Sequence, residues 1–212
     1  MPKSFGPEDV QVLEKVREHD GYFKVDKYTF KHRKHDGRWS VPLTREVFER
    51  GHAVCVVLFD PDLDKLVFVE QFRPGAFAAL SSPWFDEKEQ SPWLIECVAG
   101  IIDDGETPES VAKREALEEA NCEVLELLPA LHYLVSPGGT SESMYIFVGR
   151  TDASNAGGIH GLEHEGEDLR VLSVSTDTAF DWLDKGRFSN SMTLIAMQWF
   201  KLNHASVLQH WS

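Results

Sequence analysis

The sequence predicts an α/β protein in which helices pack on a mixed sheet. Along the chain, strand-like and helix-like periodicities follow the order β-rich, helix, β-rich, helix, helix. The first 50 residues add an antiparallel β region. The 212 residues are enough for one sizeable core and for one or two domains. We therefore expect two regions, residues 1–50 and 51–212.

Composition places the chain among soluble globular proteins. It is 42% hydrophobic and 26% charged, and no apolar run approaches the ~20 residues of a membrane span. The N-terminal stretch MPKSFGPEDV lacks the apolar core of a signal peptide. We expect a cytoplasmic protein that does not associate with membranes.

The net charge and the cysteines indicate which partners are disfavoured and in which cellular compartment the protein works. A formal net charge of −14 disfavours nucleic acid as a partner, and the one concentrated basic run, KHRKHDGR at 31–38, is interpreted as an exposed turn. The three cysteines form no CxxC motif and lie in apolar, strand-like contexts. We interpret Cys55, Cys97 and Cys122 as buried free thiols in a reducing compartment.

The elements of the first half follow from periodicity and turn residues. Residues 10–19, VQVLEKVREH, are compatible with a short helix, and two or three strands follow around the turn HDG. The runs AVCVVLFD and KLVFVEQFR, joined by PDLD, predict a hairpin. Residues 75–93 are rich in Pro, Ser and Gly and are interpreted as a loop, and WLIECVAG as a strand.

The second half continues with strands and ends with helices. CEVLELLPALHYLVS and SMYIFVGRTD predict two long strands around SPGGTSE, and the Gly-rich acidic stretch 155–168 predicts a mobile loop. After the strand LRVLSVS, a helix is expected to begin at a cap formed by Thr176 and Asp177 and to stop at Gly186. The last segment predicts a longer amphipathic helix whose core residues are Leu194, Met197, Trp199 and Leu202.

The stretch ETPESVAKREALEE has the signals of a helix over about Pro108–Ala120. Thr107 can cap its N-terminus, and Pro108 fits the first helical position. Glu109 lies at the positive end of the helix dipole, and Asn121 can close the C-terminus in the left-handed conformation.

Three carboxylates gather on one side of this predicted helix. At 100° per residue, Glu115, Glu118 and Glu119 cluster beside a row of small residues that lets the helix approach a sheet, Ala112, Ala116 and Ala120. Like charges at this spacing repel by about 0.2–0.5 kcal/mol per pair. A solvated face with salt bridges, such as Arg114 with Glu118, is one interpretation, and a Mg²⁺ site is the other. Leu117 points elsewhere and is expected in the core.

The same residues resemble the signature of the Nudix family, GX5EX7REUXEEXGU, where U is a bulky aliphatic residue. Gly100, Glu106 and the run Arg114–Glu119 stand at the required spacing. Ala116 is smaller than the usual aliphatic residue and Asn121 replaces a glycine, but no metal-binding position is lost. The stretches ERGHAV, VEQFRPGA, WLIECVAG, SPGGTSE and GIHGLEHEGED are similar to the ADP-ribose pyrophosphatase branch.

The resemblance implies a metal centre and a general base. It assigns the metals, two or three Mg²⁺ that Mn²⁺ can replace, to Glu115, Glu119 and the Ala99 carbonyl, with Glu118 as a further ligand or a catalytic partner. Arg114 would orient the carboxylates, and Glu106 would tie the signature together. In the loop GLEHEGED, Glu165 is the first choice for the base. Glu167 is the second choice, or else a metal ligand.

The resemblance also implies how a nucleoside diphosphate sugar would bind. Arg73 is the first candidate for contact with a phosphate and Arg45 the second. Glu142 resembles the acid that contacts the ribose or phosphate region. Tyr22 and Phe23 are candidates for stacking on adenine across a homodimer to which the N-terminal strands contribute.

The resemblance therefore implies a Nudix-type α/β/α sandwich and a Mg²⁺-dependent hydrolase that converts ADP-ribose to AMP and ribose 5-phosphate. One alternative keeps the chemistry with another substrate, such as GDP-mannose. A second is a non-catalytic ADP-ribose sensor, and a third is an acidic interaction module without an active site.

Overall fold

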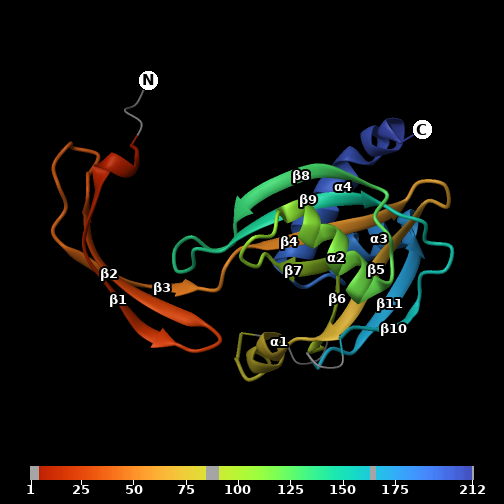
Figure 1. Cartoon of the computed structure of the whole chain (residues 1–212), viewed down its shortest axis with the longest axis horizontal. Helices are drawn as coiled ribbons and strands as arrows, with labels where there is room; N and C mark the ends of the chain where they lie inside the picture. The colour runs from red at the N-terminus through yellow and green to blue at the C-terminus, as the bar shows by residue number, and fades with distance from the viewer. Residues whose placement is uncertain (1–4, 85–90, 163–165, 212) are drawn as a thin grey trace. The chain divides into compact units, whose positions relative to one another are not determined.

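A computed structural model describes residues 5–84, 91–162 and 166–211, and the chain divides into two compact units (Figure 1). Unit 1 comprises residues 1–52 and 134–143, and unit 2 comprises residues 53–133 and 144–212. Within the described residues, no helix is long and apolar enough to cross a membrane.

Unit 1 is a three-stranded antiparallel sheet in the order β1-β2-β3. A short 3-10 helix, η1 (Pro7–Asp9), leads into β1 (Val10–Asp20), which pairs with β2 (Lys24–His32), and β2 pairs with β3 (Leu43–Glu49). The helix expected at residues 10–19 is wrong, because this segment is β1. All eleven of its residues are exposed.

Two contacts organise unit 1. The Asp26 carboxylate, on β2, is 1% exposed and accepts hydrogen bonds from Arg17 and Lys15 on β1, which lower its pKa to about 2. The second segment of the unit returns beside β3, where the Phe48 N–H donates to the Gly139 carbonyl at 2.8 Å.

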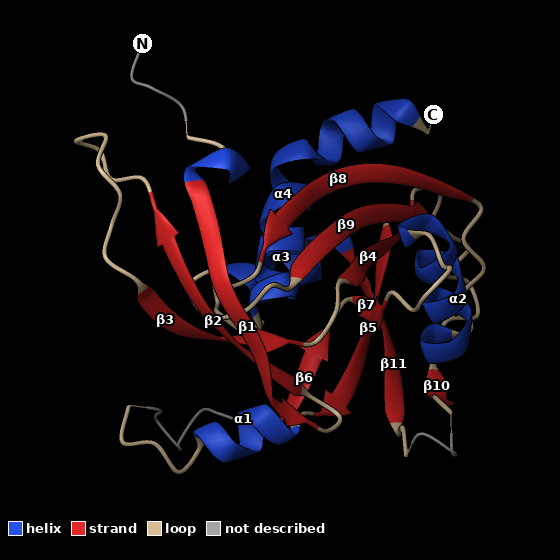
Figure 2. Cartoon of the chain, turned by 60° about the vertical axis from the view of Figure 1, so that its left-hand side comes forward, coloured by secondary structure: helices blue, strands red, loops and turns tan. Residues whose placement is uncertain are grey.

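Unit 2 is built on a mixed sheet in the order β10-β11-β5-β4-β9-β8, shown in Figure 2. Its central strand β4 (Ala53–Asp60) runs parallel to β9 (Ser143–Arg150) and antiparallel to β5 (Lys65–Phe72), as the predicted hairpin requires. The remaining strands of this order are β8 (Glu126–Leu134), β10 (Gly158–His160) and β11 (Leu169–Ser175). The predicted loop at 155–168 thus contains a short strand, β10, which pairs with β11.

The β4–β5 hairpin splits open at one end, and two short strands fill the split. β4 pairs with β5 only over Leu58–Asp60, while its first half pairs with β7 (Val98–Ile101). The last four residues of β5 pair instead with β6 (Trp93–Glu96). The segment that precedes and includes Gly100 is therefore held by the pairing of β6 with β5 and of β7 with β4.

Helices cover both faces of this sheet, which confirms the predicted α/β/α sandwich. On one face, α2 (Pro108–Ala120) packs over a core formed by alternate residues of β4 and β5, including Val54, Val56 and Val67. The opposite face meets α3 (Thr176–Asp184) and α4 (Ser191–His210), where the Phe59 ring packs on Phe200 at 5.1 Å.

The expected helices of unit 2 form, with corrections at particular side chains. Ser175, rather than Thr176 or Asp177, caps α3 by accepting a hydrogen bond from the Thr178 N–H at 3.2 Å. Met197 is fully buried in α4 as expected, but Leu202 is 86% exposed. The predicted loop at 75–93 contains part of a short helix, α1 (Pro74–Ala79), that the sequence analysis missed.

Candidate active site

Helix α2 has the boundaries and the caps that its sequence predicts. The Thr107 hydroxyl accepts a hydrogen bond from the Ser110 N–H at 3.1 Å, and Asn121 closes the helix in the left-handed conformation with φ of 50°. Ala112, Ala116 and Ala120 are buried against the sheet, as expected. Leu117 is 56% exposed, so its expected place in the core is wrong.

The row of alanines brings the carboxylates of α2 against the backbone of β7. A Cβ added to Gly100 would collide with Cγ, Cδ and Oε1 of Glu115. Next to it, the Ala99 N–H donates a hydrogen bond to Glu119 Oε2 at 3.2 Å. The contact of Ala99 seen here therefore uses its N–H, whereas the resemblance implied a role for its carbonyl oxygen.

Arg114 gathers the remaining acids of the signature into one network. Its Nε and Nη2 donate to the two oxygens of Glu106, at 2.9 and 3.1 Å. Its Nη1 donates to Glu115 Oε1 at 2.7 Å and to Glu118 Oε2 at 3.0 Å, so the predicted pair of Arg114 with Glu118 is confirmed. Hydrogen bonds with Glu106 and Glu118 hold the pKa of Arg114 above its usual range, so its guanidinium stays positively charged.

Glu115 and Glu119 are poorly solvated for carboxylates. Burial raises the pKa of Glu115 to about 7, against the opposing effect of Arg114. Burial likewise raises the pKa of Glu119 to about 8, although the Ala99 N–H favours its charged form, and Glu119 is only 3% exposed. One buried and one half-buried carboxylate, whose charges are only partly compensated, form a site that a cation would stabilise.

Glu167 lies close enough to both carboxylates for its charge to raise their pKa values. Its own Oε2 accepts a hydrogen bond from the Leu162 N–H at 3.0 Å. Gly161, with φ of 106°, makes room for this contact, since an added Cβ would lie 2.7 Å from the Glu167 Cβ. Glu165, the first choice for the general base, lies outside the described residues.

Arg73 is held by an acid that the sequence analysis did not identify. Its Nη2 donates to Glu96 Oε2 at 2.6 Å, and Glu96 is 1% exposed at the end of β6. Burial lowers the pKa of Arg73, but the bonds with Glu96 more than offset this, and Glu119 and Glu167 add to the rise. The signal was available, because a glutamate inside an apolar strand is seldom buried without a partner.

The other predicted substrate contacts, Arg45, Glu142, Tyr22 and Phe23, belong to unit 1. Arg45 is exposed and donates to the Thr44 carbonyl at 2.7 Å. Glu142 is 7% exposed, with Arg50 Nε at 3.5 Å from its Oε1. The rings of Tyr22 and Phe23 meet edge to face at 4.8 Å, and Tyr22 is 85% exposed.

The donors near Gly100 fit a hard cation that takes few ligands from the protein. Across the described residues, no three Asp, Glu, His or Cys side chains form a group that could hold a metal ion. Glu115 and Glu118 are turned towards Arg114, and Glu119 towards Ala99. Mg²⁺ commonly uses one or two carboxylates and completes its shell with water and substrate phosphates. The carboxylate oxygens of Glu115 and Glu119 suit that requirement.

Several known proteins resemble this chain over most or all of its length. An ADP-ribose pyrophosphatase of Escherichia coli strain K12 is 42% identical over 212 residues, covering 100% of this chain and 97% of that protein. An ADP-ribose pyrophosphatase of Haemophilus influenzae is 38% identical over 207 residues, covering 98% and 93%. A GDP-mannose pyrophosphatase of Escherichia coli O1:K1 is 29% identical over 188 residues, covering 87% and 91%.

The fold and a family model agree with these relatives. A solved structure described as an ADP compounds hydrolase matches with a TM-score of 0.67 at 20% identity, covering 93% of this chain and 97% of that one. The NUDIX domain model matches residues 49–190, which include β4, the Gly100 segment, α2 and Glu167. The chain belongs to the Nudix family.

Proposed function

We propose that the protein hydrolyses the pyrophosphate of ADP-ribose to give AMP and ribose 5-phosphate. The observation that carries the proposal is the pair of half-buried Glu115 and buried Glu119, which lie against Gly100 and Ala99. All the acids of the Nudix signature are present beside them. Full-length similarity to proteins named ADP-ribose pyrophosphatase supports the choice of substrate.

We propose Mg²⁺, two or three ions, as the cofactor, with Mn²⁺ as a substitute. Glu115 and Glu119 would hold it, with Glu118 and Glu167 as further oxygen donors and Ala99 at the backbone. When bound, the metal would supply charge neutralisation at the phosphate oxygens and a water of lowered pKa. Arg114 would keep Glu115 and Glu118 aligned, since it already donates hydrogen bonds to both.

The general base belongs to the acidic loop before β11. Glu167 is a candidate because its charge reaches Glu115 and Glu119, and its Cβ is held against Gly161. Glu165 remains the first choice from the resemblance, and the two single glutamine variants separate them. The base variant should lose turnover, whereas a ligand variant should also need more metal for half-maximal rate.

We propose Arg73 as the contact for a substrate phosphate and a second copy of the chain as the partner. Arg45 would be a second phosphate contact, and Glu142 would contact the ribose or phosphate region. Tyr22 and Phe23 of the second copy would stack on adenine. The whole length of β1 is exposed, with apolar side chains at Val10, Val12, Leu13 and Val16. A homodimer that covers β1 would bury them.

Localisation and other partners follow from charge and redox state. The three buried cysteines are free thiols, which supports a reducing compartment such as the cytoplasm. A net charge of −14 would repel nucleic acid, so we propose no nucleic-acid partner.

A second candidate activity is hydrolysis of GDP-mannose, because a GDP-mannose pyrophosphatase is 29% identical over 188 residues.

A product assay tests the proposal. The purified protein would be incubated with ADP-ribose, ADP-glucose and GDP-mannose, each with Mg²⁺ and with EDTA, and AMP or GMP would be measured. We expect AMP from ADP-ribose at the highest kcat/KM, and no product with EDTA. A preference for GDP-mannose would support the second candidate. Binding of ADP-ribose without any product would support a sensor, and no Mg²⁺ binding would support an interaction module.

A further inference from the structure

We propose that Glu96 is a positioning residue that fixes the Arg73 guanidinium and leaves one edge of it open to a substrate phosphate. This inference rests on the proposed hydrolysis of a nucleoside diphosphate sugar, in which Arg73 is the phosphate contact. It adds a residue outside the Nudix signature to the site.

The contacts between the two side chains are concentrated on one part of the guanidinium. Arg73 Nε lies 3.1 Å from each oxygen of Glu96, and Nη2 lies 2.6 Å from Oε2. Gln71 Nε2 donates to the same Oε2 at 3.3 Å, which fixes the carboxylate from a second side. Among the described residues, Nη1 has no hydrogen-bond partner. The guanidinium is therefore held by Nε and Nη2, with Nη1 available.

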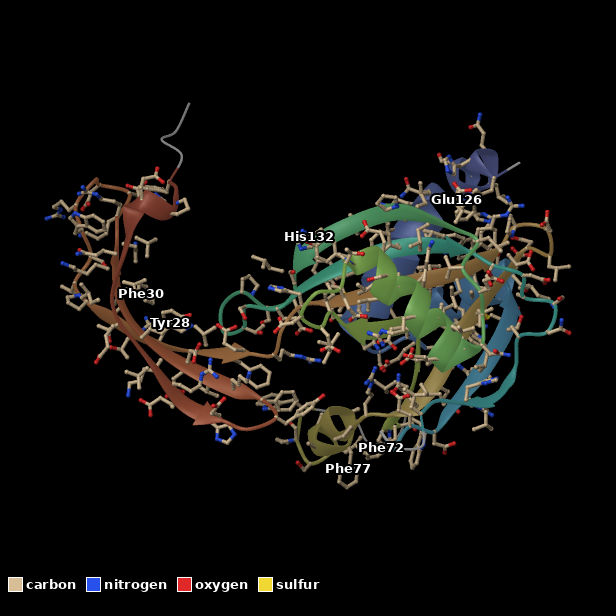
Figure 3. The ribbon with its side chains drawn as sticks, in the orientation of Figure 1. Tyr28, Phe30, Phe72, Phe77, Glu126 and His132 are labelled. Atoms are coloured by element: carbon tan, nitrogen blue, oxygen red, sulfur yellow. The ribbon has the colours of Figure 1, made fainter. Side chains whose placement is uncertain are left out.

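The strand register places this pair on the same face of the sheet as the carboxylates. Glu96 is paired with Val69, and Val69 packs in the core beneath α2. Because side chains alternate along β5, Gln71 and Arg73 share the face of Val69. The Phe72 side chain lies on the other face, where its ring centroid is 6.2 Å from that of Phe77 in α1 (Figure 3).

Electrostatics also point to a role in orientation. The charges of Glu119 and Glu167 both reach Arg73, so the guanidinium lies near the proposed cation site. An unrestrained arginine there would compete with a cation for these carboxylates. Glu96 compensates the charge of Arg73 and holds its Nε and Nη2 by hydrogen bonds.

Stability alone is a weak reason for such a pair. A buried ion pair is often no more stabilising than apolar side chains of the same volume, because both charges must be desolvated. A requirement for a fixed guanidinium explains why Glu96 is placed against Arg73 at 1% exposure, while the Arg73 side chain remains 39% exposed.

The test is steady-state kinetics of ADP-ribose hydrolysis with Glu96→Gln, Arg73→Lys and the double variant. For Glu96→Gln we expect KM to rise about 10- to 100-fold while kcat changes by less than about threefold, as expected for loss of a charge-assisted hydrogen bond to substrate. Arg73→Lys should behave similarly, because an ammonium cannot contact Glu96 and a phosphate with the same fork geometry. The double variant should be no worse than the poorer single variant.

Glu70→Gln is the matched control. Glu70 lies on the same strand but on the opposite face, where it pairs with Arg170 at 2.6 Å. The substitution removes one ion pair from β5 without touching Arg73, so KM should not change. The melting temperature of every variant would be measured in parallel.

Several outcomes would overturn the proposal. These are an unchanged KM in Glu96→Gln, an equal rise of KM in Glu70→Gln, or independent, multiplicative effects of the two site substitutions. If Glu96→Gln does not fold, Arg73→Lys decides the question, and a wild-type KM in that variant rejects the proposal. Failure of the proposed function would look different, because the wild-type protein itself would release no AMP from ADP-ribose.

Discussion

Gly100 and Glu115 lie in direct contact, with the backbone of the glycine against the aliphatic part and one oxygen of the glutamate. An added Cβ at Gly100 would occupy the space of Glu115 Cγ, Cδ and Oε1. Gly100, the first residue of the Nudix signature, therefore leaves room for Glu115, which is fifteen positions later in the sequence. The fixed spacing between the two residues corresponds to a contact between β7 and α2.

Gly100→Ala should therefore displace the Glu115 carboxylate. We expect kcat/KM for ADP-ribose to fall by about 100-fold, in the range seen when residues that support a metal ligand are lost. Gly75→Ala is the control, because nothing lies within 4 Å of the position of its Cβ and its φ is ordinary. Equal activities of the two variants would contradict the role of the contact.

Glu119→Gln and Glu115→Gln should each lower turnover by at least about 100-fold while the fold is kept. An amide keeps the size of the carboxylate and removes the negative charge that would bind a cation. Circular dichroism would show an unchanged fold, and calorimetric titration with Mg²⁺ would show weaker binding. Full activity in both variants would reject the metal assignment.

The stability of the metal-free protein should fall as pH rises through the titration of Glu119. Its pKa is raised from 4.5 to about 8 by burial, so the folded state binds this proton more tightly than the unfolded chain. The contribution is complete below pH 4.5 and lost as pH rises through 8, by at most about 1.4 kcal/mol per pH unit.

Urea unfolding in EDTA, at about pH 6 and about pH 9, measures this loss. The free energy of unfolding of the wild type should decrease relative to Glu119→Gln as pH rises. Mg²⁺ should restore part of the wild-type value at the higher pH and have less effect on the variant. The same difference between the two proteins at both pH values would contradict the assignment.

Arg114→Ala should destabilise the protein by about 1–3 kcal/mol, because it removes charge-assisted hydrogen bonds to three carboxylates at once. Added Mg²⁺ should recover part of this loss by neutralising the same acids. Lys185→Ala is the control for a surface pair, since Lys185 Nζ lies 2.8 Å from Asp181 Oδ2 on the surface of α3 and should contribute less than about 0.5 kcal/mol. Thermal unfolding of the three proteins provides the comparison.

Val12→Lys should weaken the proposed homodimer, because Val12 is 57% exposed on β1 and a lysine there would be buried against the second copy. Light scattering with size-exclusion chromatography would show a shift towards the monomer. Val41→Lys replaces a valine that is 72% exposed outside the strands and should leave the mass unchanged. A monomeric wild type would remove the basis for the dimer.

Local signals were sufficient to predict α2. Thr107, Pro108 and Asn121 act within one or two turns of their own positions, and the structure confirms both ends of the helix. The alanine row was readable because helical geometry alone puts those residues on one side. The prediction for Leu117 was wrong because α2 buries a single face. That face is formed by Val111 and the row of alanines, and Leu117 points away from it.

Features that depend on distant pairing were less predictable. In residues 10–19 the spacing of the valines fits either a helix or a strand. The segment forms a strand because it pairs with β2, and this pairing contains two register shifts. Glu96 was overlooked because its partners, Arg73 and Gln71, lie 23 and 25 residues away. The domain boundary at residue 50 and the roles of the site residues stay predictions.

The burial of every cysteine gives the protein an internal reporter. Cys55, Cys97 and Cys122 are at most 2% exposed, and all three belong to unit 2. Cys122 lies in the core under α2, whereas Cys55 alternates with Val54 and Val56 on β4 and faces the other side of the sheet. A thiol-reactive dye can therefore modify all three only when unit 2 opens on both faces of its sheet, whereas fraying of β1 should leave them unmodified. The labelling rate of the unmodified wild-type chain would measure, without any engineered probe, how firmly a bound cation or nucleotide closes that unit.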